Sequence, residues 1–492
     1  MKPLLARIVV LVAGAAILVV ETLATRLVAP YVGLTLESTT AAIGVALAGI
    51  AGGAALGGRW ADRFPPRRVA AGALAAGGLG VLAVQPLVRV LGPAFGPGPV
   101  AAVLLVAAST LVPVIALAMV TPAVTRARLS GVDGSGTVIG QLSAASTLGS
   151  LAGTFLTGFV LVALLPVTAI LLMTAGGCLL LALLTAASLA RAAKVGTTAA
   201  LLTVALVAVP GRCDADTVYH CARVQADGAT TRVLVLDDLR HSAVDLADPQ
   251  RLQFAYIQRF ADAVDTAFPP GRPLDAVHLG GGGFTMPRWL AATRPGSSST
   301  VLEVDRGVVD LGRRELGVAA IPGLQVRIGD ARTELATLPT GSADVVVGDA
   351  FGARSVPWHL ATTEFADQVH RVLRPGGVYL LNIIDADPMN LLAAEAATLA
   401  TRFPHVALLA RPDQLAPAGH GNAVLVASTR PLDLTALAAR AAARGEPGSV
   451  VDEAGVRALA AGAPVLTDDF APTDQLLGDA LRTAPYRRSI VD

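Results

Sequence analysis

Long apolar runs dominate the first 210 residues of the chain, and few charged positions interrupt them. A helix needs about 20 mostly apolar residues to cross a bilayer. Runs of roughly that length cover residues 7–29, 38–57, 69–91, 100–120, 138–165 and 167–190, and a shorter one covers 195–209. The first run is too long for a signal peptide, and five more follow it. The pattern predicts an all-α, multi-pass membrane bundle of about seven spans over residues 1–210.

The periodicity changes after residue 210. Residues 218–224 and 233–237 form short strand-like runs, which predicts a small antiparallel β-unit, and a helical pattern follows at 250–266. Apolar strands then alternate with helical segments; the strands cover residues 275–279, 300–305, 325–328, 343–348 and 378–384, with later ones near 405–410 and 422–428. Such alternation predicts a doubly wound parallel sheet. We therefore expect a β-unit with a linking helix over 211–270 and an α/β domain over 271–492.

Composition and charge separate the same two parts. The 492 residues are 53% hydrophobic and 15% charged, which argues against a wholly soluble or disordered chain. Residues 1–210 hold 12 Lys and Arg against 4 Asp and Glu, whereas the remaining residues hold 26 against 33. The acidic part offers no polybasic face for nucleic acid, and the bilayer is the expected partner of the basic, apolar part.

Arginines in the short loops predict how the spans are oriented. Four lie between the second and third runs and two more follow the fourth run, while the intervening loops are nearly free of positive charge. Because such residues stay in the cytoplasm, the N-terminus is predicted to be cytoplasmic. The side of the acidic part stays open. It lies outside the cytoplasm if residues 195–209 cross the membrane, and inside if that segment only lies at the interface.

Two pairs of residues have two interpretations each. Cys213 and Cys221 begin the acidic part; they form a disulfide in an oxidising compartment or stay unpaired thiols. Glu21 and Arg26 lie within the first span, where ionisable groups are costly. They form an ion pair that orients this helix, or they line a path for a solute or a proton.

Glycines and carboxylates follow the ends of the predicted strands, the edge at which α/β sheets bind ligands. Gly280, Gly281 and Gly282 come after the first of these strands, where bare backbone can approach a ligand. The later ends carry Glu303 with Asp305, Asp330 with Ala331, and Asp349. A carboxylate at the second end can accept ribose hydroxyls, and one at the third can accept from an adenine amine. The set predicts an adenosine-type ligand.

Longer stretches of the chain resemble spermidine synthases, the polyamine aminopropyltransferases, and specifically the bacterial proteins that fuse this domain to a transporter-like membrane region. The similar stretches are residues 219–220, 232–237, 248–256, 279–288, 303–305, 329–330, 349 and 466–472, with 21–30 in the first span. The resemblance implies a Rossmann-like fold of the class I methyltransferase type. It also implies aminopropyl transfer from decarboxylated S-adenosylmethionine to an amine in polyamine biosynthesis, with methylthioadenosine as product and no tightly bound cofactor.

The resemblance also assigns roles to single residues. Asp349 matches the proton acceptor of the family, and Glu303 and Asp330 match its nucleoside-binding positions. On the side of the amine substrate, Tyr256 matches a family tyrosine, and His241 replaces a glutamine.

Three further positions on the amine side depart from the family. Gly283 and Gly352 replace aspartates, and Ile257 replaces a histidine. Each ammonium group of a diamine needs a carboxylate or an equivalent partner when it leaves water. These departures therefore argue against putrescine as the acceptor.

Two other functions stay open. One is an S-adenosylmethionine-dependent methyltransferase, although such enzymes usually carry an acidic residue just before the glycine loop, where residues 277–279 are Val-His-Leu. The other is a non-catalytic nucleoside-binding or scaffold domain on the transporter-like bundle. Placement outside the cytoplasm favours the latter, because the nucleoside donor is made in the cytosol. The scattered histidines predict no metal site, and a homo-oligomer is compatible with the sequence.

Overall fold

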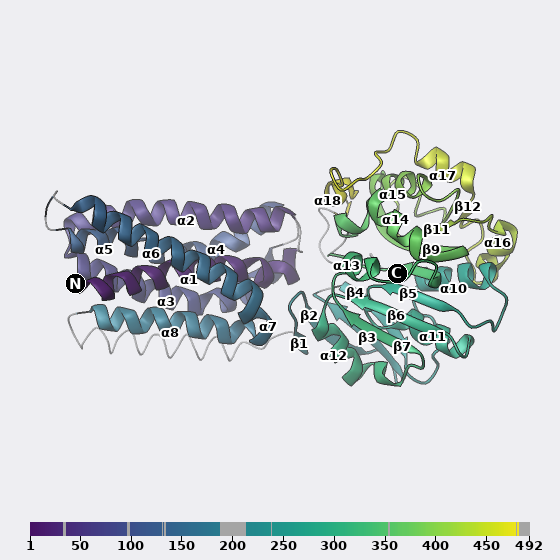
Figure 1. Cartoon of the computed structure of the whole chain (residues 1–492), viewed down its shortest axis with the longest axis horizontal. Helices are drawn as coiled ribbons and strands as arrows, with labels where there is room; N and C mark the ends of the chain where they lie inside the picture. Colours follow the sequence, from purple (N-terminus) through teal and green to yellow (C-terminus); the bar gives the residue numbers. More distant parts are fainter. Residues whose placement is uncertain are drawn as a thin grey trace. The chain divides into compact units, whose positions relative to one another are not determined.

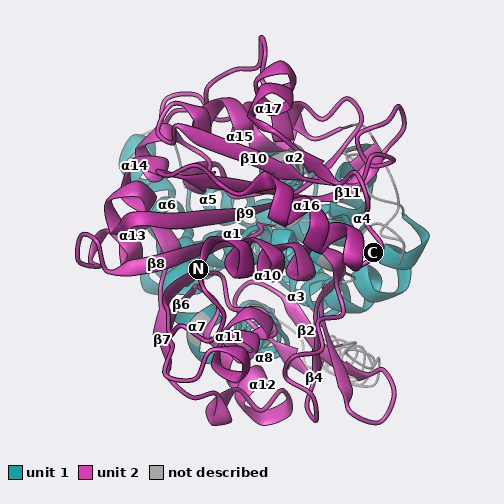
Figure 2. Cartoon of the chain, turned by 90° about the vertical axis from the view of Figure 1, so that its right-hand side faces the viewer, with its two compact units in different colours: residues 1–212 teal, residues 213–492 magenta. Residues whose placement is uncertain are grey.

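The computed structural model describes residues 1–32, 36–95, 99–129, 131, 134–186, 213–237, 239–352, 355–478 and 480–481. The chain divides into two compact units, Met1–Arg212 and Cys213–Asp492 (Figures 1 and 2). Each unit is described by itself below.

The first unit consists of helices. They are α1 (Pro3–Val32), α2 (Leu36–Arg63), α3 (Pro66–Leu91), α4 (Pro99–Ala118), α5 (Val120–Arg128), α6 (Ser135–Leu156), α7 (Val162–Leu164) and α8 (Val167–Thr185), with short 3-10 and π turns at Gly92–Ala94 and Thr157–Leu161. Among the described residues, six helical stretches are long and apolar enough to cross a membrane, which confirms an apolar helical bundle. The predicted seventh segment, residues 195–209, lies outside the described residues.

Glycines allow two of these helices to approach closely. A Cβ atom at Gly149 of α6 would collide with the carbonyl oxygen of Leu11 on α1. One at Gly153 would lie 2.5 Å from the carbonyl oxygen of Ala15. Lipid tails are as apolar as the side chains, so helices in a membrane associate mainly through such close packing.

The second unit begins with a four-stranded antiparallel sheet. Its strands are β1 (Ala215–Asp216), β2 (Cys221–Ala226), β3 (Thr231–Leu236) and β4 (Leu239–Asp245). A disulfide joins Cys213 to Cys221 and closes the loop around β1. The interpretation of these two residues as a bonded pair is therefore the one that the structure shows. Helix α10 (Ala255–Ala267) links this sheet to the next.

The larger sheet has eight strands in the order β12-β10-β11-β9-β8-β5-β6-β7. They are β5 (Asp275–Leu279), β6 (Ser298–Glu303), β7 (Leu324–Ile328), β8 (Ala343–Gly348), β9 (Leu373–Ala386), β10 (His405–Leu409), β11 (His420–Ser428) and β12 (Val450–Val451). The five strands from β5 to β9 are parallel, as the alternating pattern predicts. The last three pair antiparallel, so the complete sheet is mixed rather than purely parallel.

Helices cover both faces of this sheet. They are α10, α11 (Thr285–Thr293), α12 (Arg306–Glu315), α13 (Ala331–Ala336), α14 (Thr363–Val372), α15 (Asn390–Ala400), α16 (Leu434–Ala443), α17 (Glu453–Leu459) and α18 (Thr473–Leu476). Figure 2 shows β9 passing between α15 and α10. Alternate β9 side chains enter the two cores: Leu381 belongs to the core that also holds Leu391 of α15, and Leu380 belongs to the core that also holds Phe260 of α10.

The strand order reverses between β5 and β8. From β5 the chain proceeds to β6 and β7 on one side, and then returns to β8 and β9 on the other. In open α/β sheets, ligands bind outside the carboxyl ends of the strands at such a reversal. Gly280 follows β5 and Asp349 follows β8, so both lie at this point of the fold.

Candidate active site

The glycine loop after β5 is a tight backbone turn. Gly280 and Gly282 have positive φ angles of 90° and 48°, a region that side chains disfavour. A Cβ atom at Gly280 would lie 2.7 Å from the carbonyl oxygen of Asp349. The loop therefore needs glycine both for its conformation and for its close approach to the end of β8.

Glu303, at the end of β6, holds this loop in place. Its Oε2 atom accepts a hydrogen bond from the Gly281 amide at 2.7 Å, and its Oε1 atom accepts one from the Asp305 amide at 2.8 Å. Burial raises the pKa of the Glu303 carboxyl, and the two amide bonds counteract part of that rise. The structure brings Glu303 and the glycine loop together; its binding of a ribose stays a prediction.

Asp305 and Asp330 both cap helices. Asp305 accepts from the Gly307 amide at 2.9 Å at the start of α12, and the Thr217 hydroxyl bonds to its other oxygen. Asp330 accepts from the Arg332 amide at 3.0 Å at the start of α13, directly before Ala331. An Asp at the N-cap satisfies helix amides that would otherwise lack partners. Asp305 is buried, and both of its carboxylate oxygens accept hydrogen bonds from protein groups. The structure therefore gives Asp305 a structural role, and its binding of a ligand stays a prediction.

Asp330 remains partly accessible to solvent, and it lies near the rings of His359 and Tyr219. Its Oδ2 atom lies 2.7 Å from Nε2 of His359. Tyr219, which belongs to one of the stretches that resemble the family but was given no role in the site, lies near enough to Glu303, Asp305 and Asp330 that their charges add to burial in raising its pKa. The disulfide-closed loop from Cys213 to Cys221 carries this tyrosine. An aromatic ring beside several carboxylates suits a purine nucleoside, and a tyrosine in a short cysteine-bounded segment is the signal that could have revealed it.

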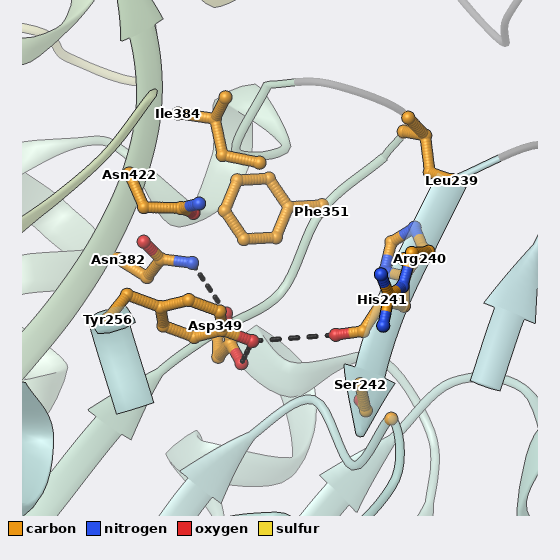
Figure 3. A pocket seen from close by; sticks show the side chains of 11 residues that line it. Leu239, Arg240, His241, Ser242, Tyr256, Asp349, Phe351, Asn382, Ile384 and Asn422 are labelled. Carbon is orange, nitrogen blue, oxygen red and sulfur yellow. Dashed lines mark hydrogen bonds between the residues drawn. The ribbon is translucent and has the colours of Figure 1, made fainter. Parts of the chain in front are cut away.

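Asp349 is the central group of the site (Figure 3). Its Oδ2 atom accepts from the Tyr256 hydroxyl at 3.1 Å, and its Oδ1 atom accepts from Nδ2 of Asn382 at 2.9 Å. Burial raises the pKa of the Asp349 carboxyl to about 6, against the effect of these two bonds. The group is therefore mostly ionised at neutral pH and still basic enough to take a proton.

A small cavity, partly open to solvent, adjoins Asp349. It is lined by Leu239, Arg240, His241, Ser242, Tyr256, Gly282, Asp349, Phe351, Asn382, Ile384 and Asn422 (Figure 3). The predicted residues His241, Tyr256, Gly282 and Asp349 thus come together from four separate segments. Burial and the nearby His220 lower the pKa of His241 to about 4, so its ring is neutral at physiological pH.

Two cavity residues were missed in the sequence analysis, Asn382 and Asn422. They lie 2% and 5% exposed on the neighbouring strands β9 and β11. The available signal was an amide side chain in an otherwise apolar run, since a buried polar group needs a partner or a function.

Packing accounts for two of the departures on the amine side. A Cβ atom at Gly283 would lie 2.6 Å from the Cβ atom of Ser242, and the Gly283 amide donates to the Ser242 hydroxyl at 2.8 Å. An aspartate at this position would therefore collide with β4. Ile257 is buried in the core beside Phe260. A Cβ atom added at Gly352 would have its nearest neighbours at 3.9 Å, so steric crowding does not explain the glycine there.

Fold and site together define a class: an α/β domain with a glycine loop and carboxylates where the strand order reverses, and a buried carboxylate, Asp349, beside a small cavity. Within the described residues, no cluster of His, Cys, Asp or Glu could hold a metal ion.

Comparisons with known proteins agree with this class. No family model matches the chain. A polyamine aminopropyltransferase from Vibrio vulnificus is 29% identical over 168 residues, which are 33% of this chain and 54% of the relative. The chain thus spans about half the length of that curated relative. Over the matched part, the chain resembles polyamine aminopropyltransferases, the spermidine synthases.

Solved structures give similar matches. A probable spermidine synthase from Corynebacterium glutamicum is 29% identical, with a TM-score of 0.48, and the match covers 52% of this chain and 96% of that one. The spermidine synthase of Thermotoga maritima is 17% identical, with a TM-score of 0.34, and the match covers 42% of this chain and 69% of that one.

Proposed function

We propose that the second unit transfers an aminopropyl group from decarboxylated S-adenosylmethionine to an amine, and that the apolar helices anchor it in a membrane. The observation that carries the proposal is the environment of Asp349. It combines a raised pKa with two orienting hydrogen bonds, and it lies between the glycine loop and a cavity. The similarity to polyamine aminopropyltransferases supports the same reaction.

The proposed step is a displacement at carbon. The neutral amine nitrogen attacks the propyl carbon next to the sulfonium, a C–N bond forms, and the C–S bond breaks with its electron pair going to sulfur. Methylthioadenosine leaves as a neutral thioether. Asp349 takes the proton that the amine nitrogen must lose, while Tyr256 and Asn382 keep its carboxylate oriented. The glycine loop and Glu303 hold the nucleoside in this proposal.

The variant D349N tests the base. Removing a positioned general base costs about 10²–10⁴ in rate, and methylthioadenosine should still bind within a few-fold of its original affinity. Product is measured by mass spectrometry and binding by calorimetry on the full chain in detergent. The control is D310N, because Asp310 forms only an exposed ion pair with Arg313 on α12. If D349N retains the original rate, Asp349 is not the base; if the original chain does not bind methylthioadenosine, the nucleoside site is wrong.

A second candidate function is a nucleoside-binding domain without catalysis, and one specific observation favours it. The disulfide between Cys213 and Cys221 is typical of an oxidising compartment. With a cytoplasmic N-terminus, that placement needs an odd number of crossings, which residues 195–209 would complete. Labelling of the full chain in intact cells with a membrane-impermeant maleimide, with and without a membrane-permeant reductant, locates these cysteines. An external location together with absent transfer activity supports this candidate, while cytosolic cysteines and measurable transfer exclude it.

The same calorimetry addresses the methyltransferase alternative. An aminopropyltransferase binds methylthioadenosine and the decarboxylated donor more tightly than S-adenosylmethionine, whereas a methyltransferase prefers S-adenosylmethionine and its demethylated product. A preference for the latter pair would replace the proposed reaction.

A further inference from the structure

Two buried amide oxygens in the cavity have no hydrogen-bond partner among the described residues. They are Oδ1 of Asn382 and Oδ1 of Asn422. The bond from Nδ2 of Asn382 to the Asp349 carboxylate fixes the orientation of that amide, because an ionised carboxylate only accepts. A buried acceptor left without a donor costs about 1–3 kcal/mol. A ligand that supplies donors to both oxygens would remove this cost.

The strand pairing directs both amides to one place. Asn382 is paired with Val424, and Asn422 is paired with Ile384, across the antiparallel strands β9 and β11. Side chains of directly opposed residues share a face of the sheet, and so do residues two apart on one strand. Both amides and Ile384 therefore face the cavity, as Figure 3 shows.

Three acceptor groups on residues that line the cavity match the three N–H donors of a primary ammonium group. These are the Asp349 carboxylate and the two amide oxygens. The rest of the described lining offers a second cation no carboxylate; its polar side chains are neutral apart from Arg240. Phe351, Ile384 and Leu239 are apolar, and Arg240 is itself a cation that pairs with Asp227. Of the described residues that line the cavity, Asp349 is the one carboxylate.

We propose that the acceptor is a primary monoamine with an apolar body, held by Asp349, Asn382 and Asn422, rather than a diamine. This inference rests on the proposed function and names its substrate class. A diamine would place its second ammonium group against apolar walls or beside the guanidinium of Arg240. A monoamine of similar length, such as n-butylamine, avoids that cost and still satisfies the amide oxygens.

Binding of n-butylamine and putrescine to the full chain in detergent, saturated with methylthioadenosine, tests the inference without requiring turnover. We expect n-butylamine to bind at least about 10-fold more tightly, which is the factor for about 1.4 kcal/mol. N422L should weaken the binding of n-butylamine by about 10-fold or more. N390L is the matched control, because Asn390 is exposed at the start of α15. In case N422L does not fold, N422D adds a carboxylate at the same position and should shift the preference toward putrescine.

The outcomes distinguish a failure of the proposed function from a failure of the monoamine inference. If methylthioadenosine itself does not bind, the proposed function fails. If it binds but putrescine binds as tightly as n-butylamine, or if N422L changes neither affinity, the monoamine inference fails alone. Asp238 precedes Leu239 in the chain and lies outside the described residues. D238N should leave the ratio of the two affinities unchanged, and a change would show that another carboxylate receives the amine.

Discussion

The hydrogen bond from Tyr256 to Asp349 should set the pH at which the base becomes ionised. The pKa of Asp349 is about 6 because burial raises it, and the Tyr256 hydroxyl lowers it through a bond of 3.1 Å to the carboxylate. Y256F removes the bond and keeps the ring. The ionised carboxylate then loses a partner, so the pKa of Asp349 should rise.

The size of the shift follows from the strength of one such bond. A hydrogen bond to a charged group contributes about 1.5–3 kcal/mol, and about 1.4 kcal/mol corresponds to one pKa unit. Because the site is partly open to solvent, the lower value is appropriate, and the pKa should move from about 6 to about 7. Because catalysis needs the ionised form of Asp349, the acidic limb of the pH profile of kcat/KM should shift to higher pH by the same amount.

Unfolding gives a readout that does not depend on activity. A carboxyl whose pKa is raised by folding stabilises the protein while it is protonated, and this stabilisation is lost as pH rises from its unfolded value of 3.8 to its folded value of about 6. In Y256F the loss should continue to about pH 7. Between about pH 5 and pH 8 the deficit of the variant in unfolding free energy should therefore grow by about 1 kcal/mol, and about half of this change should fall between about pH 6 and pH 7.

Y219F is the matched control, because Tyr219 lies near Glu303 and Asp330 rather than Asp349. Its acidic limb should stay where it is in the original chain. An unmoved limb in Y256F, or an equal movement in Y219F, would refute the assignment of Asp349 as the group that titrates.

Three further changes test the surroundings of the site. G283A should lower the free energy of unfolding by about 1–3 kcal/mol through overpacking against Ser242. S242G in the same chain should restore only part of it, because it relieves the overpacking but removes the hydroxyl that accepts from the residue 283 amide; thermal unfolding measures both. C213S should lower the free energy of unfolding by about 2–4 kcal/mol, and reduction of the disulfide in the original protein should lower it by the same amount. E303Q should weaken the binding of methylthioadenosine by about 10-fold or more, as measured by calorimetry. A neutral amide is a poorer acceptor than a carboxylate, both for the Gly281 amide and for the ribose hydroxyls that Glu303 is proposed to bind.

Local sequence patterns account for much of the fold. The parallel strands β5 to β9 follow from short apolar runs that alternate with helical segments, because periodicity and turn residues are local properties. The reversed direction of β11 and β12, and hence the antiparallel pairing of β9, β11, β10 and β12, was not predicted. An apolar run indicates a strand but not its direction, which depends on the connection that precedes it.

The carboxylates at the strand ends show a second limit. Their sequence positions correctly place Glu303 and Asp349 at one edge of the sheet. Those positions do not distinguish a ligand-binding carboxylate from a helix cap. Asp305 and Asp330 each precede a helix, which is also the position of an N-cap, and the structure shows that both cap.

The amine side of the site depends on tertiary register alone. Asn382 and Asn422 are separated by 40 positions, and they face one cavity only because β9 and β11 pair with Asn382 opposite Val424. A shift of one residue would turn the Asn422 side chain to the other face, toward the core on the α15 side. A lost carboxylate can be seen in the sequence, as at Gly283, but the amide pair that remains can be found only in the folded chain. The missing carboxylates therefore argue against a diamine, and the paired amides indicate which amine takes its place.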